Sequence, residues 1–384
     1  MKWSFIFRSG HKEPVDSRLY WIGFNMVRGV GAVRFRTLLN HFGSLEIAWN
    51  APQEALKEAG LSPKSIQHLQ HLREEPNFFK RLSDYLEKHQ ICYVLWDDPE
   101  YPTLLKQIDQ PPPVLYYKGD LLPQDEIAVA IVGTRKMTTY GRQVTEEVAS
   151  FLARNGVCVV SGLARGVDAV AHEVALKEGG RTFAVLGCGL DRIYPPEHSK
   201  LAEKIIQQGA LISDYAPGTP PDAVNFPPRN RIISGLSLAT VVVEAGEESG
   251  ALITATFAVE QGREVFAVPG NIHASQSKGT NRLIQQGAIP LLSAEEILED
   301  LHLSRVSEKQ TAKKVLPADP LEEKILKALE QQPLHIDEIS IAIDLPVEQV
   351  SAILTFMELK GLVRHLGTMI YASLYDSSLL KKGK

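Results

Sequence analysis

The sequence predicts an α/β protein built around a Rossmann-like doubly wound parallel sheet, flanked by a small N-terminal all-α domain and a C-terminal winged helix. Three observations predict this fold. Short β-rich runs alternate with helical stretches from Ile127 onward, helix-period apolar residues precede them, and a pattern of three helices and a hairpin follows a polar stretch near the C-terminus. The 384 residues, 44% of them hydrophobic, are enough for two or three domains.

Residues 1–90 are predicted to form an all-α domain that is similar to SAM and helix-hairpin-helix domains. A turn with Gly29 and Gly31 precedes a helix predicted from Val33 to Phe42. Such a turn can offer backbone N–H groups to a DNA phosphate. The alternative is a plain turn between two helices that needs glycine for a positive φ.

Residues 91–301 are predicted to form the Rossmann-like domain. Its proline-rich start, residues 96–119, is interpreted as a connection into a new unit. Right-handed crossovers between the runs that follow predict a parallel sheet, and nearly every Gly-rich or charged motif comes just after a strand, at the edge where such sheets bind ligands. The predicted strands are 127–132, 157–160, 182–186, 210–212, 240–244, 265–268 and 289–292.

Residues 302–318 are polar and lack a core pattern, so they are predicted to be a linker. Residues 319–384 are predicted to be a winged helix, with helices over 321–328 and 347–359, a middle helix that begins at Ile336, and a hairpin. The tail has no strongly basic recognition helix, so a partner-binding role and weak duplex binding both stay open.

Composition limits the functions that the chain can perform. A formal net charge of -5 argues against a broad basic face for duplex DNA, so a nucleic-acid site has to be local. The three cysteines are far apart, and neither a disulfide framework nor a thiolate metal site is predicted. No apolar run approaches the roughly 20 residues that cross a bilayer. We therefore expect a cytoplasmic protein with no membrane partner, no metal and no cofactor.

The first Gly-rich loop follows the first predicted parallel strand. Gly133, Thr134, Arg135 and Lys136 lead into a helix that is expected to begin near Tyr140. Glycine lets the backbone approach a ligand, the helix start offers N–H groups, and two cations lie beside them, which suits a phosphate. The spacing fits neither a dinucleotide fingerprint nor a nucleoside triphosphate loop. A structural turn with solvated charges is the alternative.

The second loop repeats this chemistry after the second predicted parallel strand, and its expected anion-binding residues are Ser161, Gly162, Arg165 and Gly166. His172 lies one helical turn after Asp168, so the two can be interpreted as a catalytic pair. Asp168 is also a good helix N-cap, and an Asp–His contact at this spacing is common in helices. We predict no catalytic residue here.

The third motif places Arg229, Asn230 and Arg231 at the start of a predicted helix. Two arginines two positions apart point in different directions, so one can hold a phosphate while the other is buried in an ion pair, for which Glu244 is the candidate partner. Phe226, just before them, can stack on a base or belong to the core.

The fourth motif joins a buried strand to a helix through an acidic glycine loop. The amides of Ser249 and Gly250 can bind an anion, whereas Glu247 and Glu248 oppose dense negative charge. We interpret these acids as a lip that limits where phosphates lie.

In these motifs the chain resembles the DNA-processing protein A family, also called Smf, most clearly from about Trp96 to Asp300. The motifs that carry the resemblance are Gly133–Arg135, Ser161–Asp168 with Ala171 and His172, Tyr194–Pro195, Phe226–Ile233, Glu244–Ala245, Ser249–Thr254 and Val268–Gly270. Some relatives have a basic residue after the Tyr-Pro pair, where this chain has Pro196, Glu197 and His198. One charge of the family's DNA groove is therefore expected to be missing.

The resemblance implies a non-enzymatic single-stranded DNA-binding protein that protects incoming DNA and loads the RecA recombinase during natural transformation. It also implies a homodimer formed through the Rossmann-like domain, with Arg135 as the main DNA contact. Two other functions stay open. One is a nucleotide-cleaving Rossmann enzyme related to cytokinin-activating phosphoribohydrolases, using Glu244 or Asp168. The other is a transcription regulator that acts through the tail domain.

Overall fold

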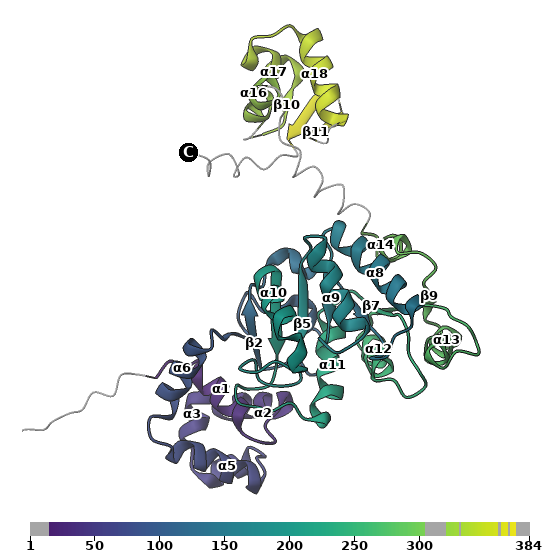
Figure 1. The fold of residues 1–384 in the computed structure, drawn as a ribbon. Coiled ribbons are helices and arrows are strands. Elements are labelled where there is room, and N and C mark those ends of the chain that lie inside the picture. Colours follow the sequence, from purple (N-terminus) through teal and green to yellow (C-terminus); the bar gives the residue numbers. More distant parts are fainter. Residues whose placement is uncertain (1–14, 304–319, 330–331, 360–361, 368, 374–384) are drawn as a thin grey trace, which may run out of the picture. The chain divides into compact units, whose positions relative to one another are not determined.

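The computed structural model describes residues 15–303, 320–329, 332–359, 362–367 and 369–373, and the chain divides after Ala294 into two compact units (Figure 1). Most of the predicted linker, residues 304–318, lies outside the described residues. The N-terminal helices and the large sheet belong to the same unit. The domain boundary predicted near residue 90 stays a prediction.

The N-terminal part is all-α, as expected. Its helices are α1 (Leu19–Met26), α2 (Ala32–Phe42), α3 (Leu45–Asn50), α4 (Gln53–Glu58), α5 (Pro63–Glu74) and α6 (Phe78–Lys88). In the predicted turn Gly29 has a φ of 82°, and the hydroxyl of Ser65 on α5 donates to the carbonyl of Arg28 at 2.9 Å. The backbone N–H of Arg28 in turn donates to His68 at 3.1 Å. These contacts favour the turn's structural role over a phosphate site.

The large sheet has nine strands in the order β1-β2-β6-β5-β4-β3-β7-β8-β9. From β6 to β9 all neighbours are parallel, as predicted. The strands are β1 (Cys92–Leu95), β2 (Val114–Gly119), β3 (Ala128–Val132), β4 (Cys158–Ser161), β5 (Thr182–Val185), β6 (Gly209–Ser213), β7 (Ala239–Val242), β8 (Glu264–Ala267) and β9 (Ile289–Pro290).

The strand β2 corrects the interpretation of the proline-rich segment 96–119 as only a connection, and β1, just before that segment, was not predicted. β1 pairs antiparallel with β2, and β2 pairs antiparallel with β6, so the sheet is mixed rather than wholly parallel. Prolines flank β2 without interrupting its ladder. Tyr116 on β2 is fully buried and its hydroxyl donates to Asn25 of α1 at 2.8 Å, which ties the N-terminal helices to the sheet.

Helices cover the sheet in two groups. They are α7 (Thr103–Lys106), α8 (Thr139–Arg154), α9 (Val167–Lys177), α10 (Ser199–Gln208), α11 (Phe226–Gly235), α12 (Gly250–Glu260) and α13 (Lys278–Gln285). α9 packs against both α8 and α10, while α11 packs against α12. Right-handed crossovers put the two groups on opposite faces, because the chain steps outward from β3 in one direction and from β7 in the other. Between them the strands are almost wholly buried.

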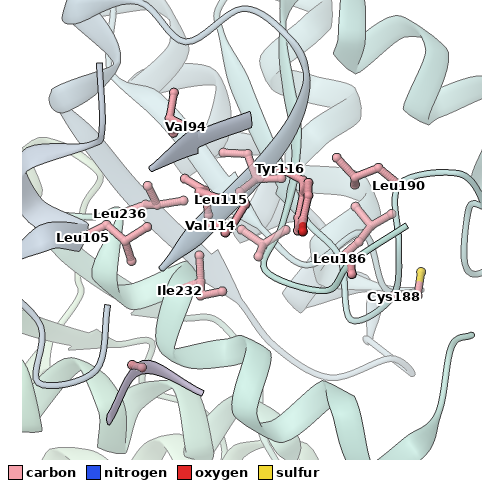
Figure 2. Packing of buried hydrophobic residues seen from close by; sticks show 14 of the residues in the cluster. Val94, Leu105, Val114, Leu115, Tyr116, Leu186, Cys188, Leu190, Ile232 and Leu236 are labelled. Atoms are coloured by element: carbon pink, nitrogen blue, oxygen red, sulfur yellow. The ribbon is translucent and has the colours of Figure 1, made fainter. Parts of the chain in front are cut away.

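Apolar side chains join β1, β2, α7 and α11 into one core. Figure 2 shows Val94, Leu115, Leu105 and Ile232 converging from these four elements. Each of them is at most 5% exposed. The core therefore holds the antiparallel edge and α11 together, which fixes the helix that carries the third sequence motif.

Gly119 ends β2 where two backbones approach closely. Its φ is 100°, and a Cβ there would lie 2.2 Å from the carbonyl oxygen of Gly209. Replacing Gly119 with alanine is expected to lower the free energy of unfolding by about 2 kcal/mol or more, from strain plus the clash. Gly287 is the control, because it has a φ of 104° and nothing within 4 Å of a Cβ. Equal losses in chemical denaturation would show that the contact with β6 does not matter.

The second unit contains α14 (Glu295–Asp300) and, after the undescribed stretch, the predicted winged helix. Its elements are α16 (Pro320–Ala328), β10 (Leu334–His335), α17 (Ile336–Ile343), α18 (Val347–Leu359), β11 (Val363–Gly367) and β12 (Ile370–Ser373). The strand β10, which was not predicted, joins the hairpin. Ile339, Leu354 and Leu362 are fully buried in a core of their own.

In the described parts of the chain, no single helix has the length and apolarity that crossing a membrane requires. Residues Ile336–Ile343 and Val347–Glu358 would meet those criteria only when taken together, and the pair is bent by 106°.

Candidate functional site

The candidate site lies where the direction of strand addition reverses. β3 and β7 are neighbours, but the strands that follow them in sequence, β4 and β8, lie on opposite sides. The loops that leave their carboxyl ends therefore diverge and open a crevice. A cavity of about 750 Å³ occupies this position, and its walls include residues 133–136 after β3 and 248–251 at the start of α12. Three of the four predicted motifs meet here, and the second reaches the cavity through Ala164 and Asp168.

The first loop has the geometry that its sequence predicts. Gly133 is needed because a Cβ would lie 2.6 Å from the side chain of Val167. The N–H of Thr134 donates to the carbonyl of Glu244 at 2.7 Å, which anchors this loop to the end of β7. Arg135 and Lys136 are exposed, and both line the cavity. Among the described ion pairs neither cation has a partner, so both are available to an anion.

Two helix N-termini frame this loop. α8 begins after Thr138, whose hydroxyl caps it by accepting from the N–H of Gly141, and α12 begins after Ser249, which caps it by accepting from Ala251. Ser249 and Gly250 line the cavity, as expected. The partial positive charge of a helix start favours an anion within the first turn. Glu248 lines the same cavity, in keeping with the predicted acidic lip.

Glu244 has a different role from the predicted arginine pairing, and that prediction is wrong. The side chain is 3% exposed, and its carboxylate accepts from the Thr138 N–H at 2.9 Å and from the Thr138 hydroxyl at 2.5 Å. It therefore holds the residue that caps α8.

The second loop is mostly structural. The hydroxyl of Ser161 is fully buried and donates to the carbonyl of Ile131 at 2.6 Å. The N–H of Gly162 donates to Asp168 at 3.1 Å. Gly166 has a φ of 79°, and a Cβ there would lie 2.3 Å from the carbonyl oxygen of Thr134. The Ser161 hydroxyl and the Gly162 N–H are thus bound within the protein, and Gly166 lies against the backbone of the first loop. Contacts of these three residues with a phosphate stay a prediction.

Arg165 is exposed, but it is not free. Its Nε donates to the carboxylate of Glu197 at 2.6 Å, and both side chains are exposed. Glu197 lies just after the Tyr194–Pro195 pair, in the segment for which the loss of one cation was predicted, and that loss stays a prediction. Its carboxylate lowers the net positive charge beside Arg165. Exposed pairs of this kind contribute little to stability.

Asp168 and His172 do not form the catalytic pair that was considered. Asp168 accepts from the N–H groups of Gly162 and Ala164, at 3.1 and 3.3 Å. His172 is fully buried, and its Nδ1 lies 2.7 Å from the hydroxyl of Thr182. Burial, and then the positive charges of His198 and Arg229, lowers the pKa of His172 to about 3. The imidazole is therefore neutral and enclosed.

This buried imidazole predicts a pH dependence of stability. The unfolded chain takes up a proton at His172 below about pH 6.5, whereas the folded chain does so only near its pKa of about 3. Stability is therefore present above pH 6.5 and is lost as the pH falls, by about 1.4 kcal/mol per pH unit between pH 6 and 4. Urea titrations of the wild type and of His172→Gln would measure it. Parallel pH profiles would contradict the assignment.

Arg229 is buried rather than exposed to a ligand. Its Nη1 donates to the carbonyl of Gly162 at 3.0 Å and to that of Val185, and its Nε donates to Asn230 at 3.2 Å. Burial lowers the pKa of this guanidinium, and Asp168 opposes that shift. Arg229 still lines the cavity, but every described hydrogen bond that it makes is internal.

Arg231 and Asn230, the other residues of this motif on α11, are also bound internally. Arg231 donates to Asp214 at 2.6 Å and to the carbonyl of Gln110 at 2.7 Å, and it is absent from the cavity lining. The side-chain amide of Asn230 donates to the carbonyl of Gly250 at 3.2 Å. Arg231 is therefore the arginine that is held in an ion pair, with Asp214 rather than Glu244. Arg229 is buried but lines the cavity, and its contact with a phosphate stays a prediction.

An aromatic pair stands beside the cationic loop. Tyr194, which was not assigned to the site, is 40% exposed and lines the cavity together with Phe226. The two ring centroids are 5.4 Å apart with an interplanar angle of 31°. The guanidinium of Arg229 lies 5.9 Å from the Phe226 ring. The sequence did contain a signal for Tyr194. It is an aromatic residue in a Gly- and Pro-rich loop that follows β5, and such loops lie at the ligand-binding edge of the sheet.

Comparison with known proteins gives the family. The family model of DNA recombination-mediator protein A matches residues 92–302, and the model of the DprA winged helix domain matches residues 309–367. The chain belongs to the DprA/Smf family. Protein Smf of Synechocystis is 39% identical over 93% of this chain and 98% of its own length. The DNA processing protein DprA of Bacillus subtilis is 47% identical over 53% of this chain and 68% of its own length.

Two solved DprA structures resemble this fold. DNA processing protein A of Streptococcus pneumoniae has a TM-score of 0.63 and 31% identity, covering 74% of this chain and 97% of that one. The Helicobacter pylori protein, described for its single-stranded DNA binding mode, has a TM-score of 0.51 and 32% identity, covering 56% of this chain and 96% of that one. Family membership and the Rossmann-like fold with its winged helix are thus confirmed.

Proposed function

We propose that this chain binds single-stranded DNA in the cavity between the β3 and β7 loops. The observation that carries the proposal is the pair of exposed cations, Arg135 and Lys136, at the rim of a cavity that also contains the start of α12. A phosphate at this position accepts charge-assisted hydrogen bonds from the guanidinium and meets the positive end of the helix. The relatives named for DNA processing and for single-stranded DNA binding support it.

The aromatic pair favours a single strand over a duplex. Tyr194 and Phe226 present ring surface beside the cations, and an unpaired base can stack on such a surface whatever its identity. In a duplex the faces of the bases are covered by their neighbours. The net charge of -5 and the acidic Glu248 at the cavity also disfavour a long run of duplex phosphates.

The cellular role that we propose follows from family membership. The chain protects incoming single-stranded DNA and delivers it to the RecA recombinase during natural transformation, as a homodimer formed through the Rossmann-like domain. Binding that relies on the backbone and on stacking fits this role, because incoming DNA has no fixed sequence. We propose no catalytic step.

The nucleotide-cleaving alternative finds little support in the candidate acids and bases. Glu244 is buried with its carboxylate bound by Thr138, and His172 is enclosed. Asp168 lines the cavity, but its carboxylate already accepts from two backbone N–H groups. A general acid or base needs access to the reacting atoms. Incubation with nucleoside monophosphates is expected to release no base, and release that depends on Glu244 would favour the enzyme.

The test is a mobility-shift titration with a 40-nucleotide single strand of mixed sequence, its duplex, and a second single strand of unrelated sequence. The proposal predicts similar affinity for the two single strands and at least about tenfold weaker binding of the duplex. Equal affinity for the duplex, or recognition of one sequence only, would contradict it.

A further inference from the structure

The helix-turn-helix of the second unit has an unusual charge. Residues 336–359 span α17 and α18, and they contain no lysine, arginine or histidine. Their five carboxylates are Asp337, Glu338, Asp344, Glu348 and Glu358. In a winged helix that binds duplex DNA, the second of these helices enters the major groove between two rows of phosphates. Five carboxylates without a cation on either helix oppose that position, because phosphate contacts supply much of the affinity.

The exposed face of α18 carries apolar groups instead of cations. Glu348, Gln349, Ala352, Thr355 and Phe356 are exposed, and their spacing of three and four residues puts them on one side of the helix. We call these five residues the α18 face. Phe356 is 64% exposed at one end, whereas the opposite side of the helix is held in the core by Val350, Leu354 and Met357, none of which is exposed.

A second apolar side chain stands out on the preceding helix. Ile341 of α17 is 82% exposed, although its neighbours Ile339 and Ile343 are buried in the core of the unit. Large apolar side chains that a fold leaves in water on both helices of one motif indicate a binding surface more often than single exposed residues do. The carboxylates on the same two helices indicate that a partner of this surface carries positive charge.

We propose that the α18 face binds a segment of another protein, one that carries lysine or arginine residues around at least one apolar side chain, and that it does not bind duplex DNA. The apolar side chain of the partner packs on Phe356 and Ala352, and its cations pair with Glu348 and neighbouring carboxylates. Charge complementarity of this kind steers association and rejects partners of like charge, DNA among them.

Two of the glutamates on α17 and α18 form hydrogen bonds within the fold, and a third does not. Glu338 accepts from the N–H of His335 at 2.8 Å as part of a capping box, and Glu358 accepts from the N–H of His365 at 3.1 Å. These two acids stabilise the fold. Glu348, in the first turn of α18, has no described hydrogen bond or ion pair, so it is the acid to reverse in a test.

The experiment uses the full chain with the photo-crosslinking residue benzoylphenylalanine in place of Phe356, expressed in the organism that encodes it. Ile47, which is 57% exposed on α3, receives the same residue as a control position. Crosslinked products are digested and sequenced by mass spectrometry. The proposal predicts a crosslink from position 356 to a protein segment with at least two Lys or Arg within a few residues of an apolar side chain, and not from position 47.

Reversing the charge of Glu348 tests whether the partner binds through its cations. Adding Glu348→Lys is expected to reduce the crosslink at least fivefold, whereas Glu173→Lys, the same change on an exposed residue of α9, is expected to leave it intact. Retained thermal unfolding of the second unit checks that the variants fold. A crosslink only to DNA or to this chain itself, no crosslink, a partner segment without cations, or indifference to Glu348→Lys would overturn the proposal.

Discussion

Arg229→Met is expected to lower the free energy of unfolding by about 3–5 kcal/mol, the usual cost of removing one partner from a buried charged network. The side chain is 5% exposed, and its guanidinium binds two carbonyl groups from different strand ends, those of Gly162 and Val185. Its removal leaves these acceptors unpaired. It also removes the charge that opposes the burial-raised pKa of Asp168. Chemical denaturation followed by circular dichroism measures the loss.

Arg154→Met is the matched control. Arg154 is also paired with a carboxylate, Glu178 at 2.8 Å, but its side chain is 66% exposed. Exposed pairs contribute about 0–1 kcal/mol, so this variant is expected to unfold almost as the wild type does. A loss below about 1 kcal/mol for Arg229→Met would mean that the internal network does not depend on the guanidinium. Arg229 would then be available to bind DNA, as the sequence predicted.

Arg135→Ala is expected to weaken single-stranded DNA binding by about tenfold or more, because a hydrogen bond to a charged group contributes about 1.5–3 kcal/mol. The loss is expected for every sequence alike. The slope of log affinity against log salt is also expected to become shallower by about 0.7, since one fewer phosphate is neutralised. Stability is expected to change little, because Arg135 is exposed and has no described ion pair.

Arg142→Ala controls for the loss of one positive charge. Arg142 lies on α8 close to the same loop, is 54% exposed, and pairs with Glu146 rather than lining the cavity. Fluorescence anisotropy at several salt concentrations compares the two variants. If the two variants lose single-stranded DNA affinity to the same extent, the loss comes from the change in net charge and not from a contact in the cavity.

The parallel part of the fold and the position of the site could be predicted because both follow from local patterns. The buried β-rich run that ends at Ile131–Val132 is followed directly by glycine and two cations. This pattern indicates both where the strand ends and where the next helix begins. Such loops gather at one edge of a parallel sheet whatever the details of packing. The strands β1 and β2 were missed because flanking prolines obscured a short antiparallel pair.

The role of each arginine could not be predicted, because it depends on contacts distant in sequence. Arg135 and Arg229 both follow a Gly- or Pro-rich stretch, yet one is exposed and the other binds the carbonyl of Val185, 44 positions away. The partner of Arg231 is Asp214, on the loop after β6, and not Glu244. Tyr194 became a site residue only through its contact with Phe226.

The most direct measurement is a crystal structure of this protein with a short oligothymidylate. The proposal predicts a backbone phosphate within hydrogen-bonding distance of Arg135 and the first turn of α12, and a base stacked on the ring of Tyr194 or Phe226. A strand bound elsewhere, with this cavity filled only by solvent, would contradict it.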